Sequence, residues 1–308
     1  MPVAAIILVV LSALLHASWN IIGKSNKGSV QAFFFMSAFC SALLLSPYLL
    51  WFYFQAGDAV FSAEFWGLLL IGGLFQIIYL LALGFAYQKA EVGLVYPMAR
   101  ALPVLLVGSL SFWMGQVLSP LQWLGFALIT LGCLFVPLQR FRELSFNRYL
   151  NTGILWAAVA ALGTTGYSII DKMALSILSE QLNKIDNDQL TPPILSDQLI
   201  SIFYLGAQFW ATALPLAIYF ILRGQYQEFT EAWRIKKQAC IAGLMMGITY
   251  ALVLNAMLLT DNVSLVVALR QISIVFGLLM GSYWLKEKLY FTRIIGCGFI
   301  FCGLLVVI

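Results

Sequence analysis

The most restrictive feature of this 308-residue chain is an internal repeat. A set of residues in the first half recurs in the second half at an offset that is constant to within one residue. The first copy holds Leu94, Val95, Arg100, Leu118, Gly125 and Gly132, and the second holds Leu265, Val266, Arg270, Leu289, Gly296 and Gly303. The sequence therefore predicts two related units, residues 1–145 and 146–308. The repeated glycines predict close helix packing.

Both copies consist almost entirely of apolar stretches. The chain is 62% hydrophobic and 10% charged, whereas about a quarter of the residues in soluble domains are charged. An apolar helix of about 20 residues spans the hydrocarbon core of a bilayer. Stretches of suitable length are residues 3–23, 30–54, 65–88, 92–114, 121–139, 151–172, 197–222, 238–259, 262–284 and 290–308. The sequence therefore predicts a helical integral membrane protein.

The number of spans in each copy decides how the copies are related. Five is an odd number, so the second copy enters the membrane from the face opposite to the first. The predicted fold class is therefore all-α, with ten transmembrane helices arranged as two inverted five-helix repeats. Repeats of this kind are typical of secondary transporters.

Basic residues predict the orientation of the chain. All but two of the loop lysines and arginines fall in connections on one side of the ten-span arrangement, and the exceptions are Lys172 and Lys184. Because Lys and Arg mark the cytoplasmic side of a bilayer, both chain ends are predicted to lie outside the cytoplasm. We predict a multi-pass protein of a bacterial inner membrane, with an acidic external loop at about residues 173–196.

Two arginines are the candidates for a binding site. Arg100 and Arg270 lie eight residues into predicted spans, about 12 Å from a helix end at 1.5 Å per residue. Because inverted spans start from opposite faces, both side chains are predicted near the middle of the membrane. No Asp or Glu is expected at that depth, and a buried arginine costs about 2.5–3.5 kcal/mol unless it finds a partner or water. The pair predicts a hydrated cavity for an anion, and the alternative is that a guanidinium bonds to helix carbonyls or reaches the basic face.

Neighbouring residues extend this candidate site. Pro97 and Pro103 flank Arg100, and each removes a helix hydrogen bond, so this span is predicted to be irregular and to act as a hinge. His16, the only histidine, is the candidate for proton coupling because histidine titrates near physiological pH. The alternative for His16 is a structural bond to another helix. The remaining candidates for substrate contact are Asn20, Tyr79, Tyr96, Tyr167, Tyr250 and Ser273.

Motifs for other chemistry are absent from the sequence. The five cysteines lie in apolar spans without CxxC spacing, so they are predicted to be packing residues and not metal ligands or disulfides. There is no phosphate loop, zinc motif, nucleophile elbow or dinucleotide fingerprint. We therefore expect no enzyme activity, metal, cofactor or nucleic-acid partner. The expected partners are a small-molecule substrate and the lipid bilayer.

Three segments resemble the EamA-type members of the drug/metabolite transporter superfamily. They are HASWN at residues 16–20 with Lys24, VYPMAR at residues 95–100, and LKEKL at residues 285–289 followed by Gly296 and Gly303. The resemblance covers nearly the whole chain. It implies a basket of ten helices, in which the first four of each half surround a central cavity and the fifth packs at the side. Family members export amino acids, drugs or other metabolites, or exchange sugars and nucleotide sugars.

These features predict a secondary transporter that exports a small anionic or zwitterionic metabolite, such as an amino acid or an organic acid, by alternating access. A lipid-phosphate flippase is an alternative, since buried arginines would also suit a lipid headgroup. A multidrug efflux carrier is another, although cationic drugs usually require a buried carboxylate, which is not predicted near the arginines. A structural or partner-binding subunit would need no cavity.

Overall fold

The computed structural model is helical, with no strand among the residues that it describes. The described residues are 1–25, 28–90, 92–113, 118–143, 151–188, 197–284, 286 and 288–307. The α-helices are α1 (Val3–Ser25), α2 (Val30–Ala56), α3 (Ala63–Lys89), α4 (Val92–Trp113), α5 (Pro120–Phe135), α7 (Thr152–Asp188), α8 (Asp197–Leu222), α9 (Gln227–Arg234), α10 (Lys236–Leu258), α11 (Val263–Leu269), α12 (Ile272–Trp284) and α13 (Phe291–Val307). Two short 3₁₀ helices are η1 (Asp58–Val60) and η2 (Phe141–Glu143).

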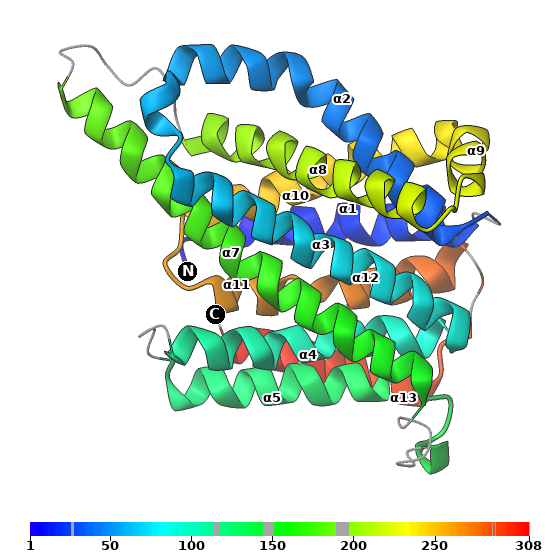
Figure 1. Ribbon diagram of the computed structural model, residues 1–308. Helices are drawn as coiled ribbons and strands as arrows, with labels where there is room; N and C mark the ends of the chain where they lie inside the picture. The colour runs from blue at the N-terminus through cyan, green and yellow to red at the C-terminus, as the bar shows by residue number, and fades with distance from the viewer. Residues whose placement is uncertain are drawn as a thin grey trace.

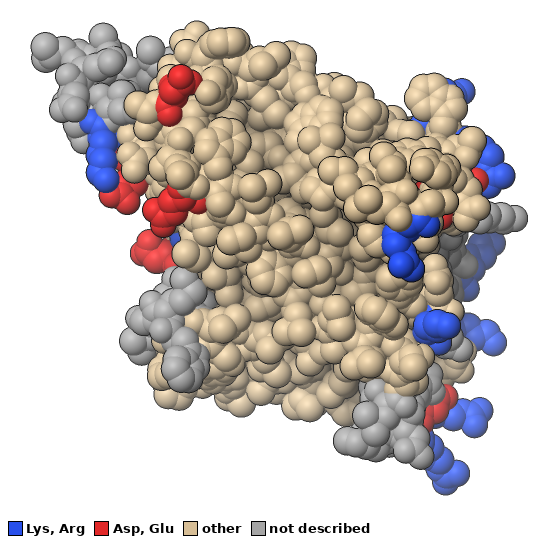
Figure 2. All heavy atoms as spheres, in the orientation of Figure 1, with Lys and Arg blue, Asp and Glu red and all other residues tan. Residues whose placement is uncertain are grey.

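The helices form a bundle of apolar segments. Among the described residues, six helical segments are long and apolar enough to cross a membrane, one of which consists of α11 and α12 together, and four further apolar helices are shorter. Both chain ends lie at the same end of the bundle (Figure 1). Lysines and arginines gather at the opposite end, and the described surface between the two ends is almost free of charged residues on the face shown in Figure 2. These features support a multi-pass membrane protein.

Serine residues fix the start of three helices. Ser29, Ser62 and Ser119 each precede a helix, and the Oγ atom of each accepts a backbone N–H from the first turn. Gln122 completes a capping box at the start of α5 by accepting the backbone N–H of Ser119. Such caps satisfy N–H groups that have no partner within the helix. The local sequence therefore determines where these helices begin.

The two halves of the chain share one core. α3 lies against α7 and α1 against α10, while α2 lies against α8. In the same way α4 lies against α7, and α1 lies against α12. Each of these contacts has a counterpart when the halves are exchanged. Neither half therefore buries its apolar surface alone, and the residues between the halves hold the bundle together.

The repeated glycines bring α5 and α13 together as predicted. A Cβ atom on Gly125 would lie 2.8 Å from the Gly303 carbonyl oxygen, and one on Gly303 would lie 2.7 Å from that of Gly125. Gly132 and Gly296 meet in the same way, at 2.5 Å and 2.7 Å. Any side chain at these positions would separate the helices. The pairing of early residues with late ones also shows that the two helices run antiparallel.

The predicted external loop at residues 173–196 is wrong for most of its length, because α7 continues to Asp188. Its 37 residues extend for about 55 Å at 1.5 Å per residue, so the helix reaches well beyond a core of about 30 Å. Glu180 and Lys184 form an ion pair of 2.8 Å, one helical turn apart on this extension. Such pairs support a solvated helix. Residues 189–196 lie outside the described part.

Candidate binding site

One apolar span is interrupted at its middle. α11 ends at Leu269 and α12 begins at Ile272, so Arg270 and Gln271 form a turn between them. The backbone N–H of Gln271 donates to the oxygen of Ala268 at 3.0 Å. This three-residue spacing is that of a 3₁₀ turn, which in the middle of a helix often marks a hinge. The single span predicted at residues 262–284 is therefore two helices.

The irregular backbone was predicted in the other half, around Pro97 and Pro103. α4 instead runs from Val92 to Trp113 without interruption, with both prolines inside it. A proline leaves a carbonyl without its helix donor, but neighbouring helices in a membrane bundle can hold such a helix together. The two prolines therefore do not interrupt α4, and their role as a hinge stays a prediction.

Two side chains donate hydrogen bonds to backbone carbonyls at the break between α11 and α12. Gln271 Nε2 donates to the oxygen of Val267 at 2.9 Å, in the place where its own backbone N–H would bond in a regular helix. Arg100 Nη2 donates to the oxygen of Arg270 at 2.9 Å and to Ser273 Oγ at 2.6 Å. Arg100 and Arg270 are 7% and 6% exposed. Both arginines are therefore buried, and the side chain of Arg100 reaches the backbone of Arg270.

Three of the predicted tyrosines form a row beside Arg270. Its guanidinium carbon lies 5.6 Å from the ring centroid of Tyr250. The ring of Tyr167 lies 6.0 Å from that of Tyr250 and 5.9 Å from that of Tyr79. A cation over an aromatic face is attracted to it, and more strongly where water is excluded. The ring of Tyr250 therefore attracts the Arg270 guanidinium, and the other two rings continue the row.

A buried carboxylate lies on the far side of Tyr250, where the sequence predicted none. Asp171 is 0% exposed. Its Oδ1 accepts hydrogen bonds from Tyr204 Oη at 2.7 Å and Gln208 Nε2 at 2.6 Å, and its Oδ2 accepts one from Tyr250 Oη. The arginines therefore have an acidic neighbour, and the prediction of two cations without a built-in anion is wrong.

The slant of α7 explains why Asp171 was missed. Counted from Thr152, it lies about 29 Å along the helix, which suggests the membrane surface. α7 crosses the other helices at an angle (Figure 1), and Asp171 packs against Gly72 of α3, where a Cβ atom would lie 3.3 Å from its Oδ1. Gly72 is only about 14 Å from the start of α3. Counting residues along one helix gives depth only when that helix is upright.

His16 on α1 joins the same region. It is 8% exposed, and the charges of Arg100 and Arg270 both act on it. The side chains of the other two candidates, Asn20 and Tyr96, lie outside the described part. The region that holds Arg100, Arg270, Asp171, His16 and Ser273 with its tyrosines is called the arginine site below. Among the described residues, no group of three or more His, Cys, Asp or Glu side chains could hold a metal ion.

Unpaired polar atoms occur next to the residues of the arginine site. Ser168 Oγ, Thr249 Oγ1 and Gln271 Oε1 are buried and have no hydrogen-bond partner among the described residues. They follow or precede Tyr167, Tyr250 and Arg270 in the sequence. An unsatisfied buried polar atom costs about 1–3 kcal/mol. Such atoms are expected where water or a ligand completes the hydrogen bonding.

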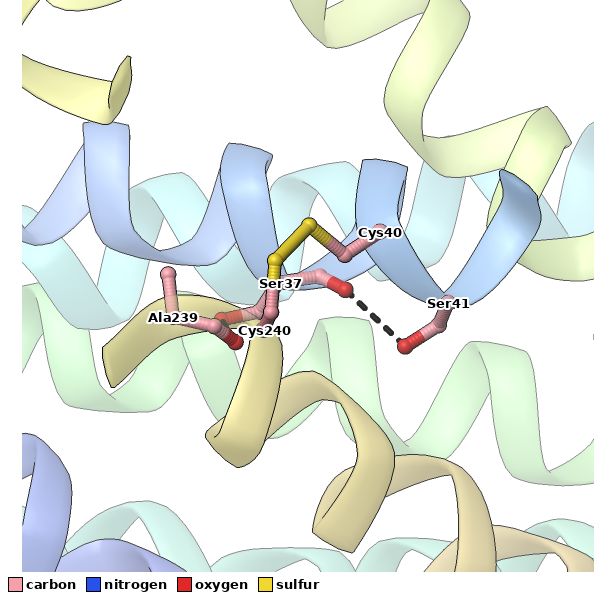
Figure 3. Close-up of a disulfide and its surroundings, with 5 residues drawn as sticks. All are labelled: Ser37, Cys40, Ser41, Ala239 and Cys240. Carbon is pink, nitrogen blue, oxygen red and sulfur yellow. Dashed lines mark hydrogen bonds between the residues drawn. A yellow bond between two sulfur atoms is a disulfide. The ribbon is translucent and has the colours of Figure 1, made fainter. Parts of the chain in front are cut away.

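A disulfide joins α2 to α10 at the side of the bundle. Cys40 and Cys240 are bonded, with Cα atoms 5.5 Å apart (Figure 3). Nearby, Ser37 Oγ donates to the oxygen of Ala239 at 3.0 Å. The prediction that all cysteines are packing residues is therefore wrong for this pair. Cys133, Cys297 and Cys302 are free thiols.

The fold and the arginine site define a class of protein: a helical membrane protein with charged side chains from both halves of the chain buried at its centre. Intramembrane ionisable residues of this kind usually line a path for a solute or an ion. The model of the EamA-like transporter family matches residues 193–308, which run to the end of α13. The match confirms the predicted resemblance over this part of the chain.

A crystal structure of another protein is similar over 98% of this chain and 96% of that chain. The TM-score is 0.64 and the sequence identity is 16%, so the likeness concerns the fold alone. No curated protein matches the sequence.

Proposed function

We propose that the protein is a secondary transporter that exports a small anionic or zwitterionic metabolite by alternating access, with Arg270 as the main contact for the anionic group. The observation that carries the proposal is the arginine site, where two buried cations from different halves of the chain meet beside a row of tyrosines. Tyr79, Tyr167 and Tyr250 would contact the apolar part of the cargo.

The packing of α5 against α13 supports two inverted five-helix repeats. Gly125 meets Gly303, and Gly132 meets Gly296. In the repeat Gly125 corresponds to Gly296 and Gly132 to Gly303, so exchanging the two halves turns one of these contacts into the other. This reciprocity is the property of a two-fold axis. Because the two helices are antiparallel, the axis lies across the helices and in the plane of the membrane, as in inverted-repeat transporters. Rocking of one half against the other about this axis would expose the arginine site to each face in turn.

The distribution of charge supports an orientation with both chain ends outside the cytoplasm of a bacterial cell. The lysine- and arginine-rich end of the bundle is the one opposite the termini (Figure 2), and basic residues mark the cytoplasmic face. A reporter that is active only in the cytoplasm, fused after Ile308, should be silent. Activity of this fusion would reverse the orientation.

The two arginines have different roles in this proposal. Arg100 bonds to the Arg270 carbonyl and to Ser273, which matches the alternative of a guanidinium that satisfies helix carbonyls. The Arg270 guanidinium lies over the ring of Tyr250 instead. A guanidinium binds a carboxylate through two parallel hydrogen bonds. We therefore assign the cargo to Arg270 and the support of the broken helix to Arg100.

Multidrug efflux is the second candidate function. Asp171 favours it, because a buried carboxylate suits a cationic drug. Its two oxygens, however, already accept three hydrogen bonds from Tyr204, Gln208 and Tyr250. Arg270 lies over the ring of Tyr250, whose hydroxyl donates to Asp171, and the charge of Arg270 opposes a second cation. Anion transport is therefore the better-supported candidate.

The test is counterflow in proteoliposomes with radiolabelled pyruvate, succinate, alanine, a cationic dye and a fluorescent phospholipid. The wild type should move a carboxylate. Arg270→Gln should lower the rate about tenfold or more, because a hydrogen bond to a charged group contributes about 1.5–3 kcal/mol. The matched control Arg234→Gln alters an exposed arginine that is paired with Glu231, and it should transport normally. Movement of only the dye or the phospholipid would replace the proposal with drug efflux or lipid flipping.

Proton coupling through His16 is part of the proposal and has its own test. His16 is buried beside both arginines. A proton gradient should drive wild-type transport, and His16→Gln should lose this dependence while counterflow at equal pH persists. An equal response to the gradient in both proteins would remove His16 from the mechanism.

A further inference from the structure

We propose that Asp171 sets the charge of the cargo, so that the arginine site accepts a solute with one net negative charge and rejects a dianion. The inference rests on the proposed function, because it assumes that the cargo binds at Arg270. It narrows the anionic or zwitterionic class to monoanions, and it makes Asp171 a specificity-determining residue.

The first step is the net charge of the arginine site without cargo. Arg100 and Arg270 supply two positive charges and Asp171 one negative charge, all on side chains that are at most 7% exposed. Lys172 follows Asp171 in sequence but points away, because its Nζ donates to the oxygens of Met257 and Thr260 at 2.7 Å and 2.8 Å. With a neutral His16, the described side chains of the site leave one positive charge in excess.

The second step is that three donors support the ionised form of Asp171 at its buried position. Three donors, from Tyr204, Gln208 and Tyr250, are directed at its two oxygens. Hydrogen bonds donated to a carboxylate stabilise its ionised form. Two of the donors come from α8 and one from α10, so three helices hold the carboxylate in place. Tyr250 also presents its ring to Arg270 at 5.6 Å, so the acidic and basic groups flank one side chain.

The third step is the charge of the loaded site. A site that is closed on both sides holds its charges away from water, and an uncompensated buried charge is costly. A monoanion brings the sum of charges to zero. A dianion would leave one negative charge, and a zwitterion would leave the original positive charge. The charge count therefore favours the monoanion, and it does so only while Asp171 is present.

The experiment compares pyruvate with succinate as stabilisers of the purified full-length protein, at about pH 8, where an ordinary histidine is neutral. In the wild type pyruvate should protect against thermal unfolding at a concentration about tenfold or more below that required for succinate. Asp171→Asn leaves two positive charges, so the order should reverse by a similar factor. Asp171→Glu keeps the charge and should keep the wild-type order.

Two further proteins serve as controls. Glu180→Gln removes an exposed carboxylate from the same helix and should leave the order unchanged. Tyr250→Phe removes a hydrogen bond to Asp171 but not its charge, so it should weaken the binding of both acids and retain their order.

A stronger effect of succinate on the wild type would overturn the inference, even if Asp171→Asn does not fold. So would the same order in wild type and Asp171→Asn, or no protection by either acid. These results are separable from failure of the proposed function. If Arg270→Gln abolishes carboxylate counterflow but the order of the two acids does not depend on Asp171, the transporter stands and only the charge rule fails.

Discussion

The fourth span of each half occupies the same place in the internal repeat, yet the two spans have different backbones. α4 carries two prolines and is continuous. Its counterpart has no proline and is divided into α11 and α12 at Arg270. Intrinsic helix propensity alone predicts the reverse, because proline is the residue that most disfavours a helix interior.

The difference teaches that side chains from elsewhere decide where a helix in this bundle breaks. The break at Arg270 and Gln271 is possible because Arg100 and the Gln271 amide occupy carbonyls that it exposes. No comparable turn interrupts the described residues of α4. Buried carbonyls must find hydrogen-bond donors. Here Arg100 of the first half donates to the carbonyl of Arg270 in the second half.

Arg100→Ala is expected to have the largest effect on the stability of the break between α11 and α12. It removes two charge-assisted hydrogen bonds from the break, and the free energy of unfolding should fall by about 3 kcal/mol. Thermal unfolding in detergent micelles measures this change. Arg234→Ala is the control, and since surface ion pairs contribute little, its loss should stay within about 1 kcal/mol. Equal stability of the two variants would show that Arg100 does not hold the break.

Ser273→Ala should have a smaller effect. Arg100 Nη2 keeps its hydrogen bond to the Arg270 oxygen but loses the one to Ser273 Oγ. This loss should lower the free energy of unfolding by about 1.5 kcal/mol. The matched variant Ser176→Ala removes an exposed hydroxyl that bonds to the oxygen of Lys172, and it should be near neutral. If Ser176→Ala is the more damaging of the two, the contact with Arg100 is unimportant.

Gln271→Leu should cost about 1 kcal/mol, because leucine has similar size but cannot donate to the oxygen of Val267. Its effect is best measured together with Arg100→Ala. Both side chains support one turn, so the double variant should lose less stability than the two single losses added together. Simple additivity would mean that they act on separate parts of the helix.

The smallest effect on stability is expected from Pro97→Ala, whose free energy of unfolding should not fall. Alanine restores a backbone N–H and is a better helix former than proline. If Pro97 acts as a hinge, as predicted together with Pro103, transport should nevertheless slow several-fold. Counterflow at the wild-type rate would leave the hinge function to the break at Arg270.

Much of the fold and part of the site could be predicted from the sequence. The apolar stretches predicted most helix ends, and the repeated glycines predicted close helix packing without naming α5 and α13 as partners. The two arginines were recognised as residues inside the spans. Asp171 was missed because its depth depends on the slant of α7, and the pairing of Cys40 with Cys240 because it joins α2 to α10 across the bundle. Both depend on the angle between helices, which local sequence does not specify.

The sequence by itself determined that this chain is a helical membrane protein with a repeated unit, because hydrophobicity and spacing are properties of residues taken in order. It also determined that two arginines lie inside the apolar spans. Only the tertiary structure decided which groups surround them: a carboxylate on a slanted helix, a row of tyrosines, and a break that accepts a donor from the other half. The physical reason is that a buried charge or carbonyl takes its partner from whichever helix packs against it, and that packing exists only once both halves are folded together.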